Sequence, residues 1–393
     1  MAVNSITPVS FARQARAAVL VNGTRQVDGN GRDVVIDARV DQNTHYQADT
    51  FTVTLPLSVQ HLTPSIDAPV DIAQSGPDYW SSLTDAEVEI FMGYPDRAGS
   101  WEPLELYRCI VGAVDDVSID FAANRVHLVG RDLTARLIDT KTVDQYVNLT
   151  ASQIVELIAA QHGLTPVVTP TETIAGGYYQ QDHVSLQDSR PQWDLLTYLA
   201  EREGFQVYVT GRELHFEPRV EAVTGEPYVI QWQTPEPGRA YPISNAISLQ
   251  CRRNLTMSRT VEVQVRSFNT KQRRGFTVTA RRARIRNRVT SAEQKLPEPA
   301  QVYTYRIPNL TEQQAQERAN RIANELSRHE MLLGAQLPGD HLLTARTPIR
   351  LIGTGSAFDQ TYLPSTIVRT FDLDGYRMDV QAKNHSPEST VLP

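Results

Sequence analysis

Short runs of alternating apolar residues, separated by turn-forming residues, fill both ends of this 393-residue chain. Near the start, Val34–Val40 and Phe51–Leu55 are rich in β-branched residues, and the turn-rich stretch Val27–Arg32 precedes them. Similar runs return from about residue 228, as in Ala246–Cys251 and Thr260–Val265. Side chains of a strand alternate between its two faces, so these runs predict strands with one buried face. Many short strands divided by turns are typical of barrels and sandwiches.

The middle of the chain has helical spacing instead. Thr150 and Gln153 form a capping-box signature before an apolar face, and Pro191 suits the first turn of a second helix. Two short apolar runs then flank Thr210–Arg212, which predicts a hairpin. Residues 143–222 are therefore predicted to form a small α+β domain.

Another helix is predicted near the C-terminal end, at about residues 311–333. Thr311 and Gln314 form a second capping-box signature, and Ala315 and Ala319 recur at helical spacing. We expect this helix, and a basic strand or arm at about 271–300, to belong to a second β region. The predicted domains are residues 1–142, 143–222 and 223–393.

The expected fold class is α+β, mostly β. It would comprise two similar tube-like β-barrel modules, a small α+β domain between them, and a helix packed near the second barrel.

An internal echo connects the two β regions. Ile110–Asp115 resembles Ile367–Asp372, and Arg125–Asp132 resembles Arg377–Asn384. Chance similarity between amphipathic hairpins is one explanation, because period-two patterns are common. Duplication is the other, and it has a geometric consequence: three chains would present six similar modules around one axis and could match a six-fold partner.

Bulk composition narrows the function classes. The formal net charge is -7, which gives no general argument for nucleic-acid binding. Cys109 and Cys251 lie far apart without neighbouring metal ligands, so two free thiols are predicted. No secretion signal and no stretch of about 20 apolar residues is present, so no membrane anchor is expected.

One strongly basic strip stands out, at residues 251–288. It holds twelve basic residues and one acidic residue, Glu262. The basic members are Arg252, Arg253, Arg259, Arg266, Lys271, Arg273, Arg274, Arg281, Arg282, Arg284, Arg286 and Arg288. In a strand, Arg282, Arg284, Arg286 and Arg288 would line one face, and they are the candidate protein-interface residues. An acidic protein partner and a plain solvated edge strand explain the strip equally well, and nucleic acid ranks behind both.

Catalytic motifs are few. His329-Glu330 begins like a zinc-binding HExxH motif, but Leu333 occupies the second histidine position. Gly353-Thr-Gly355 lacks the third glycine of a dinucleotide-binding loop. We therefore predict no catalytic residue, no metal and no cofactor, and do not expect an enzyme.

Several segments together resemble the late-control protein D family, the baseplate hub proteins of contractile-tailed phages, which are related to the hub part of type VI secretion spike proteins. The resemblance rests on segments spread in order along the chain: Gly130–Asp139, Pro191–Val209, Val263–Asn269, Leu310–Ala319, Leu337–Asp340, Ile352–Tyr362 and Gly375–Val380. It implies a homotrimeric ring of pseudo-six-fold symmetry that joins a hexameric tail tube to a trimeric central spike. It also implies contacts with baseplate wedge proteins and with the tape-measure protein.

The leading hypothesis is thus a structural hub subunit in the virion tail baseplate, assembled in the host cytoplasm. The spike is expected to be a separate chain, because the sequence ends soon after the second β region, and nucleic acid would be met only as the passing genome. The alternatives are a tail-tip cell-wall hydrolase and a nucleic-acid-binding protein that uses the arginine-rich strip. The residues do not distinguish a contractile from a non-contractile tail.

Overall fold

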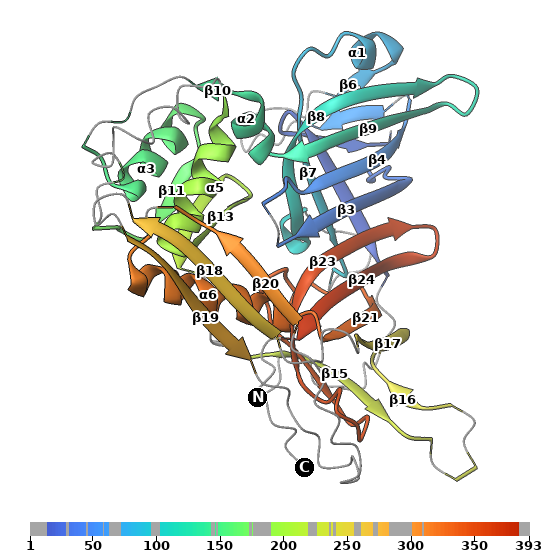
Figure 1. Ribbon diagram of the computed structural model, residues 1–393. Coiled ribbons are helices and arrows are strands. Elements are labelled where there is room, and N and C mark those ends of the chain that lie inside the picture. Colours follow the sequence, from blue (N-terminus) through green and yellow to red (C-terminus); the bar gives the residue numbers. More distant parts are fainter. Residues whose placement is uncertain are drawn as a thin grey trace.

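The fold is known from a computed structural model, which is mostly β, as predicted (Figure 1). The structure describes residues 14–28, 31–44, 46–57, 59–62, 72–95, 103–142, 146, 148–172, 175, 190–218, 226–235, 237–238, 241–254, 261–269, 274–282, 301–308 and 310–384.

The N-terminal β unit is built from antiparallel strands around one apolar core. Its elements are β1 (Arg16–Val21), β2 (Thr24–Val27), β3 (Asp37–Asn43), β4 (Thr50–Pro56), β5 (Val59–Leu62), β6 (Ile72–Ser75), α1 (Pro77–Ser81), β7 (Glu87–Gly93), η1 (Pro103–Glu105), β8 (Tyr107–Asp120) and β9 (Arg125–Asp132). Phe51, Ile90 and Leu128 are almost completely buried in this core. Trp80 of α1 is buried too, and its indole nitrogen donates a hydrogen bond to the Leu57 carbonyl at 3.0 Å.

The α+β unit follows the first β unit and has its own core. Its elements are α2 (Thr134–Asp139), β10 (Lys141–Thr142), α3 (Ala151–Gln161), β11 (Thr165–Val168), β12 (Arg190–Pro191), α5 (Gln192–Glu203), β13 (Phe205–Thr210) and β14 (Glu213–Pro218). The predicted capping box is confirmed: Thr150 accepts from the Gln153 amide, and the Gln153 side chain accepts from the Thr150 amide. The hairpin at Thr210–Arg212 is confirmed as the β13–β14 turn.

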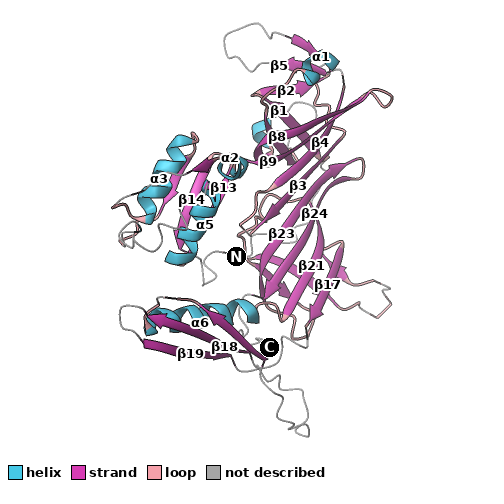
Figure 2. Cartoon of the chain, turned by 45° about the horizontal axis from the view of Figure 1, so that its top comes forward, coloured by secondary structure: helices cyan, strands magenta, loops and turns pink. Residues whose placement is uncertain are grey.

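The remaining strands form two separate packing units. The C-terminal β unit contains β15 (Tyr228–Gln233), β16 (Ile243–Ser244), β17 (Ser248–Arg253), β21 (Met331–Pro338), β22 (Ile349–Ile352), β23 (Thr361–Asp372) and β24 (Gly375–Asn384). The strand–helix unit contains β18 (Val261–Asn269), β19 (Arg274–Arg282), β20 (Gln301–Arg306) and α6 (Glu312–Ser327). Figure 2 shows α6 lying along the sheet of β18 and β19.

Helix α6 has the predicted cap but ends earlier than predicted. Thr311 accepts from the Gln314 amide, which confirms the second capping box. The helix stops at Ser327 rather than near residue 333, because Met331–Pro338 alternates between more and less buried positions and forms β21.

The two β units are one continuous sheet, in which β3 pairs with β23 (Figure 2). Hydrogen bonding between the described strands does not close either unit into a barrel. Where two closed tube-like barrels were expected, the described residues form two open β units that share one sheet.

Both cysteines are free, as predicted. Cys109 is buried and Cys251 is half-buried, and burial raises the pKa of each thiol to about 11. Among the described helices, none combines the length and apolar character required to cross a membrane.

Candidate assembly surfaces

Six strands have the same spatial order in both β units. The order is β1-β7-β8-β9-β4-β3 in the first and β15-β22-β23-β24-β21-β17 in the second. If the six strands of each unit are numbered along the chain, their order in the sheet is 1-4-5-6-3-2 in both units. The one difference in direction is that β15 runs parallel to β22, whereas β1 runs antiparallel to β7. The predicted echo therefore reflects a shared topology.

A β-bulge fixes the register of this internal repeat. It lies between Val114 and Asp116 in β8 and between Pro364 and Thr366 in β23. Aligning the bulges places Gly130 on Ala382, and hence Arg125–Asp132 on Arg377–Asn384, as predicted. The ends of two further strands agree, because Pro56 pairs with Arg125 and Pro338 pairs with Arg377.

The first half of the echo was predicted in the wrong register. Ile367 pairs with Val380, and its equivalent is Val117, which pairs with Leu128, rather than Ile110. The bulge explains the error: its extra residue shifts the alternation of faces in β8, so Ile110 and Val117 both point toward the core although an odd number of positions separates them.

Arg369 fastens the joint between the two β units. Its side chain is completely buried. Nε donates to the Gln42 side chain on β3 at 3.1 Å, and Nη1 donates to the Asp340 carbonyl at 2.7 Å and to the Tyr376 hydroxyl at 2.6 Å. The guanidinium carbon also lies 5.0 Å from the centre of the Tyr107 ring on β8. One side chain thus contacts both units, with its buried donors paired.

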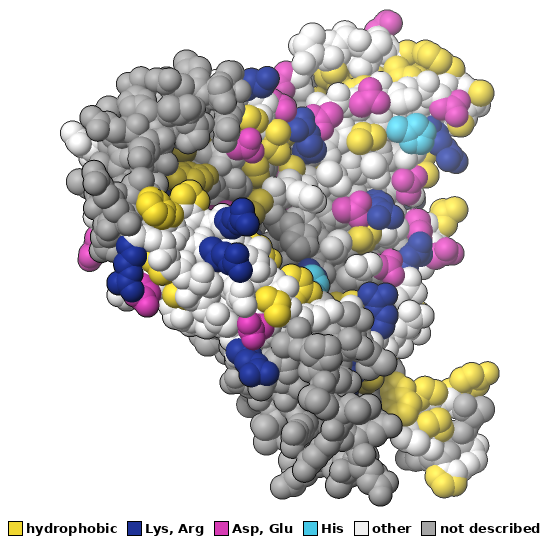
Figure 3. All heavy atoms as spheres, viewed as in Figure 1, with side chains coloured by type: hydrophobic (Ala, Val, Ile, Leu, Met, Phe, Trp, Pro, Cys, Tyr) yellow, Lys and Arg dark blue, Asp and Glu magenta, His cyan; other side chains and the backbone are white. Residues whose placement is uncertain are grey.

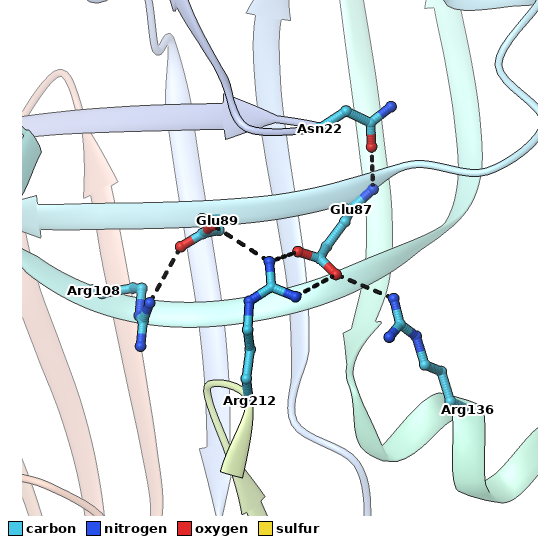
Figure 4. A network of polar contacts seen from close by, with 6 residues as sticks. All are labelled: Asn22, Glu87, Glu89, Arg108, Arg136 and Arg212. Atoms are coloured by element: carbon cyan, nitrogen blue, oxygen red, sulfur yellow. Dashed lines mark hydrogen bonds and ion pairs between the residues drawn. The ribbon is translucent and has the colours of Figure 1, made fainter. Parts of the chain in front are cut away.

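An ion network holds the α+β unit against the first β unit (Figure 4). The Glu87 carboxylate accepts from Arg136 of α2 at 3.1 Å and from Arg212 of the β13–β14 turn at 3.2 Å. Arg108 pairs with the neighbouring Glu89 at 3.4 Å. These pairs are partly exposed, so they orient the hairpin more than they stabilise it.

A cavity of about 310 Å³ lies between the two β units and the α+β unit. Asp49 and Asp132 line it, together with Arg346, which lies over the Tyr208 ring at 3.0 Å. Burial raises the pKa of Asp132 to about 8, helped by the nearby Asp49, and burial raises the pKa of Asp49 to about 6.

Each of these carboxylates has a structural role. Asp132 accepts from the Thr134 amide at 3.1 Å at the start of α2, and Asp49 accepts from the Asn43 amide at 2.8 Å. Perturbed carboxyls can mark a catalytic site, but these backbone contacts account for the placement of both. Among the described residues, no group of three or more histidine, cysteine, aspartate or glutamate side chains could hold a metal ion.

The predicted interface arginines are mostly outside the described residues. Arg282 ends β19 and pairs with Val261, whereas Arg284, Arg286 and Arg288 lie outside the described part of the chain. Their role stays a prediction. On the face drawn in Figure 3, the described basic side chains are dispersed among acidic and neutral ones.

Arg253 and Arg252 belong to the same basic strip but lie outside the predicted set of interface arginines. Arg253 forms a half-buried ion pair with Glu330 at 2.7 Å, within the C-terminal β unit. Arg252 is exposed on β17, which is the last of the described strands on that side of the sheet. The position of Arg252 on an edge strand follows from the strand order, which the sequence does not give.

Comparison with known proteins agrees on the fold. The structure is similar to a tail protein from Neisseria meningitidis MC58, with a TM-score of 0.63 and 12% identity over 94% of this chain and 97% of that chain. It is similar to the 43 kDa tail protein of prophage MuSo2 from Shewanella oneidensis, with a TM-score of 0.57 and 13% identity over 96% and 98%. It is also similar to the prophage tail protein gp18 from Listeria monocytogenes EGD-e, with a TM-score of 0.51 and 10% identity over 95% of each.

The chain has the fold of phage tail proteins. The similarity spans nearly the full length of these tail proteins, so the whole arrangement of units is shared. No protein-family model and no curated protein matches the sequence. The fold is therefore shared at 10–13% identity, although neither of these two sequence comparisons finds a match.

Proposed function

We propose that this chain is a structural hub subunit of a phage-type tail baseplate. Three copies would form a ring of pseudo-six-fold symmetry between a hexameric tail tube and a trimeric central spike. The observation that supports this most is the repeated strand order, β1-β7-β8-β9-β4-β3 and β15-β22-β23-β24-β21-β17, within one sheet. Two equivalent modules per chain turn three-fold symmetry into six similar positions.

The division of the chain follows from the same proposal. Residues 1–142 and 223–393 would carry the two ring modules, and residues 143–222 would form a peripheral domain. The separate apolar cores of the two β units and of the α+β unit support these boundaries. The strand–helix unit would be an insertion into the second module, with a core of its own.

The outward surfaces offer contacts for the other baseplate components. The β15–β16 arm, which projects from the body in Figure 1, is followed by Ile247, and Tyr241 lies two residues before the Ile243–Ser244 strand. Tyr241 is 81% exposed and Ile247 is 62% exposed. Large apolar side chains that are this exposed are candidate contacts for a protein partner. Tail-tube, spike, wedge and tape-measure proteins are the proposed partners, in the virion and after assembly in the host cytoplasm.

Reconstitution tests this function. The purified chain would be mixed with the tail-tube and spike proteins of the same tail and viewed by electron microscopy. We expect rings of this chain between the end of each tube and its spike. Tubes and spikes that join equally well without the chain would contradict the proposal. Clearing of a peptidoglycan gel by the purified chain, abolished by a point mutation, would favour the hydrolase instead.

A further inference from the structure

We propose that the outer edge of β17 pairs, antiparallel, with the Asp116–Asp120 segment of β8 in a neighbouring copy, placing Arg252 opposite Ser118. This inference rests on the proposed ring and specifies the contact between its subunits. The partner is a second copy of this chain, and the contact would repeat between copies the β3–β23 pairing seen within one copy.

Two strand edges in the described structure are suited to this contact. Strand β17 pairs with β21 on one side and has no other pairing among the described strands. The pairing of β8 with β7 ends at Ala113, and from Asp116 to Asp120 the described part of β8 pairs only with β9. An open strand edge presents backbone donors and acceptors that another strand can satisfy.

The internal joint shows how such an edge is filled. In β23, Tyr362 pairs with β22, and after the bulge the segment Thr366–Phe371 extends beyond β22 and pairs with β3. In β8, the segment after the equivalent bulge extends beyond β7 in the same way but has no β3 beside it. Because β17 is the counterpart of β3, the same pairing would fill this edge.

The register follows from residue equivalences. Val40 pairs with Phe51, which pairs with Gly130, whereas Cys251 pairs with Leu333, which pairs with Ala382. Gly130 and Ala382 are equivalent by the bulge, so Val40 corresponds to Cys251.

By the same correspondence Asp41 is the equivalent of Arg252, and alignment of the bulges makes Val368 the equivalent of Ser118. Asp41 pairs with Val368 inside the chain. Arg252 is therefore expected opposite Ser118 between chains.

The side-chain faces agree with this register. Val117 and Ile119 of β8 are half-buried and pack on the core of the first β unit. Leu249 and Cys251 of β17 are half-buried on the core of the second. In the proposed pairing Ile119 lies opposite Cys251, so the apolar face of the sheet continues from one copy into the next.

The opposite face is complementary in charge. Ser118, Asp116 and Asp120 are exposed on β8, and Arg252 is exposed on β17. Opposite Ser118, Arg252 would lie diagonal to both aspartates, within reach of a long side chain. The contact thus supplies an acidic protein partner for one residue of the basic strip.

The surface beside β8 is hollowed at this place. A groove of about 510 Å³ runs along the open edge, lined by Val114–Val117 and Ile119 on one side and by residues 80–81 and 83–86 on the other. An incoming strand would occupy the space next to the open edge. The bulge, the matching faces, the charges and the groove all point to the same segment.

Cysteine cross-linking tests the register. In a Cys251→Ser background, Ser118→Cys and Arg252→Cys are combined; paired strand residues have Cα atoms about 4.5–5.5 Å apart, within disulfide range. The matched control combines Ser118→Cys with Ser248→Cys, which is on the same exposed face of β17 but about 13 Å further along it. All three positions are exposed, so the fold should tolerate the substitutions. Native mass spectrometry before oxidation gives the number of copies.

We expect mild oxidation to convert most of the Ser118→Cys/Arg252→Cys chains to covalent dimers and trimers, reversed by dithiothreitol, with at least tenfold less in the control. A three-copy assembly that cross-links no better than the control would overturn the inference while leaving the proposed function standing. A chain that remains monomeric at every concentration would contradict both.

Discussion

The guanidinium of Arg369 donates a hydrogen bond to the side-chain oxygen of Gln42, 3.1 Å away, and so joins β23 to β3 across 327 positions of the chain. The first prediction is that Arg369→Met lowers the free energy of unfolding by about 3 kcal/mol, because the Asp340 carbonyl and the Tyr376 hydroxyl lose a buried partner. Urea denaturation measures this change.

Arg377→Met is the control for that variant. Arg377 lies on the same hairpin, but its ion pair with Asp372, at 2.7 Å, is partly exposed, so its loss should cost less than about 1 kcal/mol. Equal losses for the two variants would contradict the role given to Arg369.

The second prediction concerns Gly130 in β9. A Cβ atom there would lie 2.1 Å from the Ala113 carbonyl oxygen and 2.6 Å from the Phe51 ring. Gly130→Ala should therefore lower the free energy of unfolding by about 2 kcal/mol or more, as overpacked cores do. Gly334→Ala is the matched strand control, since its nearest neighbour is 3.9 Å away, and it should be almost neutral. The same thermal-denaturation assay compares both, and similar melting temperatures would refute the packing argument.

The third prediction is a pH dependence of stability. Burial raises the pKa of Asp132 to about 8, whereas in the unfolded chain this carboxyl loses its proton at about pH 4. Between about pH 4 and about pH 8 the folded chain therefore holds a proton that the unfolded chain has already released. Stability should therefore fall as the pH rises through this window, and Asp49, with its pKa raised to about 6, adds to the fall in the lower part.

Asp132→Asn tests this effect without removing the acceptor for the Thr134 amide. We expect its melting temperature to change less with pH than that of the wild type, and to exceed it near pH 8. Asp374→Asn, at a carboxylate that is 87% exposed, is the control and should follow the wild-type curve. Parallel curves for Asp132→Asn and the wild type would show that Asp132 does not titrate in this window.

The fourth prediction concerns the network in Figure 4. Glu87→Gln weakens the pairs with Arg136 and Arg212, and the partly exposed setting limits the loss of global stability to about 1 kcal/mol. The local effect should be larger: amide hydrogens of the β13–β14 hairpin should exchange several-fold faster. Glu213→Gln, at a carboxylate that contacts His215, is the control. Unchanged exchange in the hairpin would mean that the pairs with Glu87 do not hold it in place.

Local features of this fold were legible in the sequence. Both capping boxes, at Thr150 and Thr311, could be predicted because a capping box depends only on two residues three positions apart in the sequence. The predicted end of α6 was wrong because Met331–Pro338 is apolar enough to continue a helix. Only its pairing with other strands shows that this segment is the strand β21. The bulges in β8 and β23 hid the register of the repeat, since the sequence does not show where in a strand an extra residue lies.

Residues of the candidate surfaces were harder to predict. Alternation along a strand predicts four arginines of the basic strip as interface residues. It does not separate Arg252 from its neighbours, whereas the strand order places Arg252 on an edge strand. The burial of Arg369 and Asp132 also depends on contacts between distant segments. No local pattern contains that information.

The central claim, a three-copy ring with six similar positions, is tested most directly by single-particle electron microscopy of the purified chain. We predict closed rings with three copies and a strong six-fold component, in which the two β units of each copy alternate around the channel. Monomers, or closed rings in which only one of the two β units surrounds the channel, would contradict the claim.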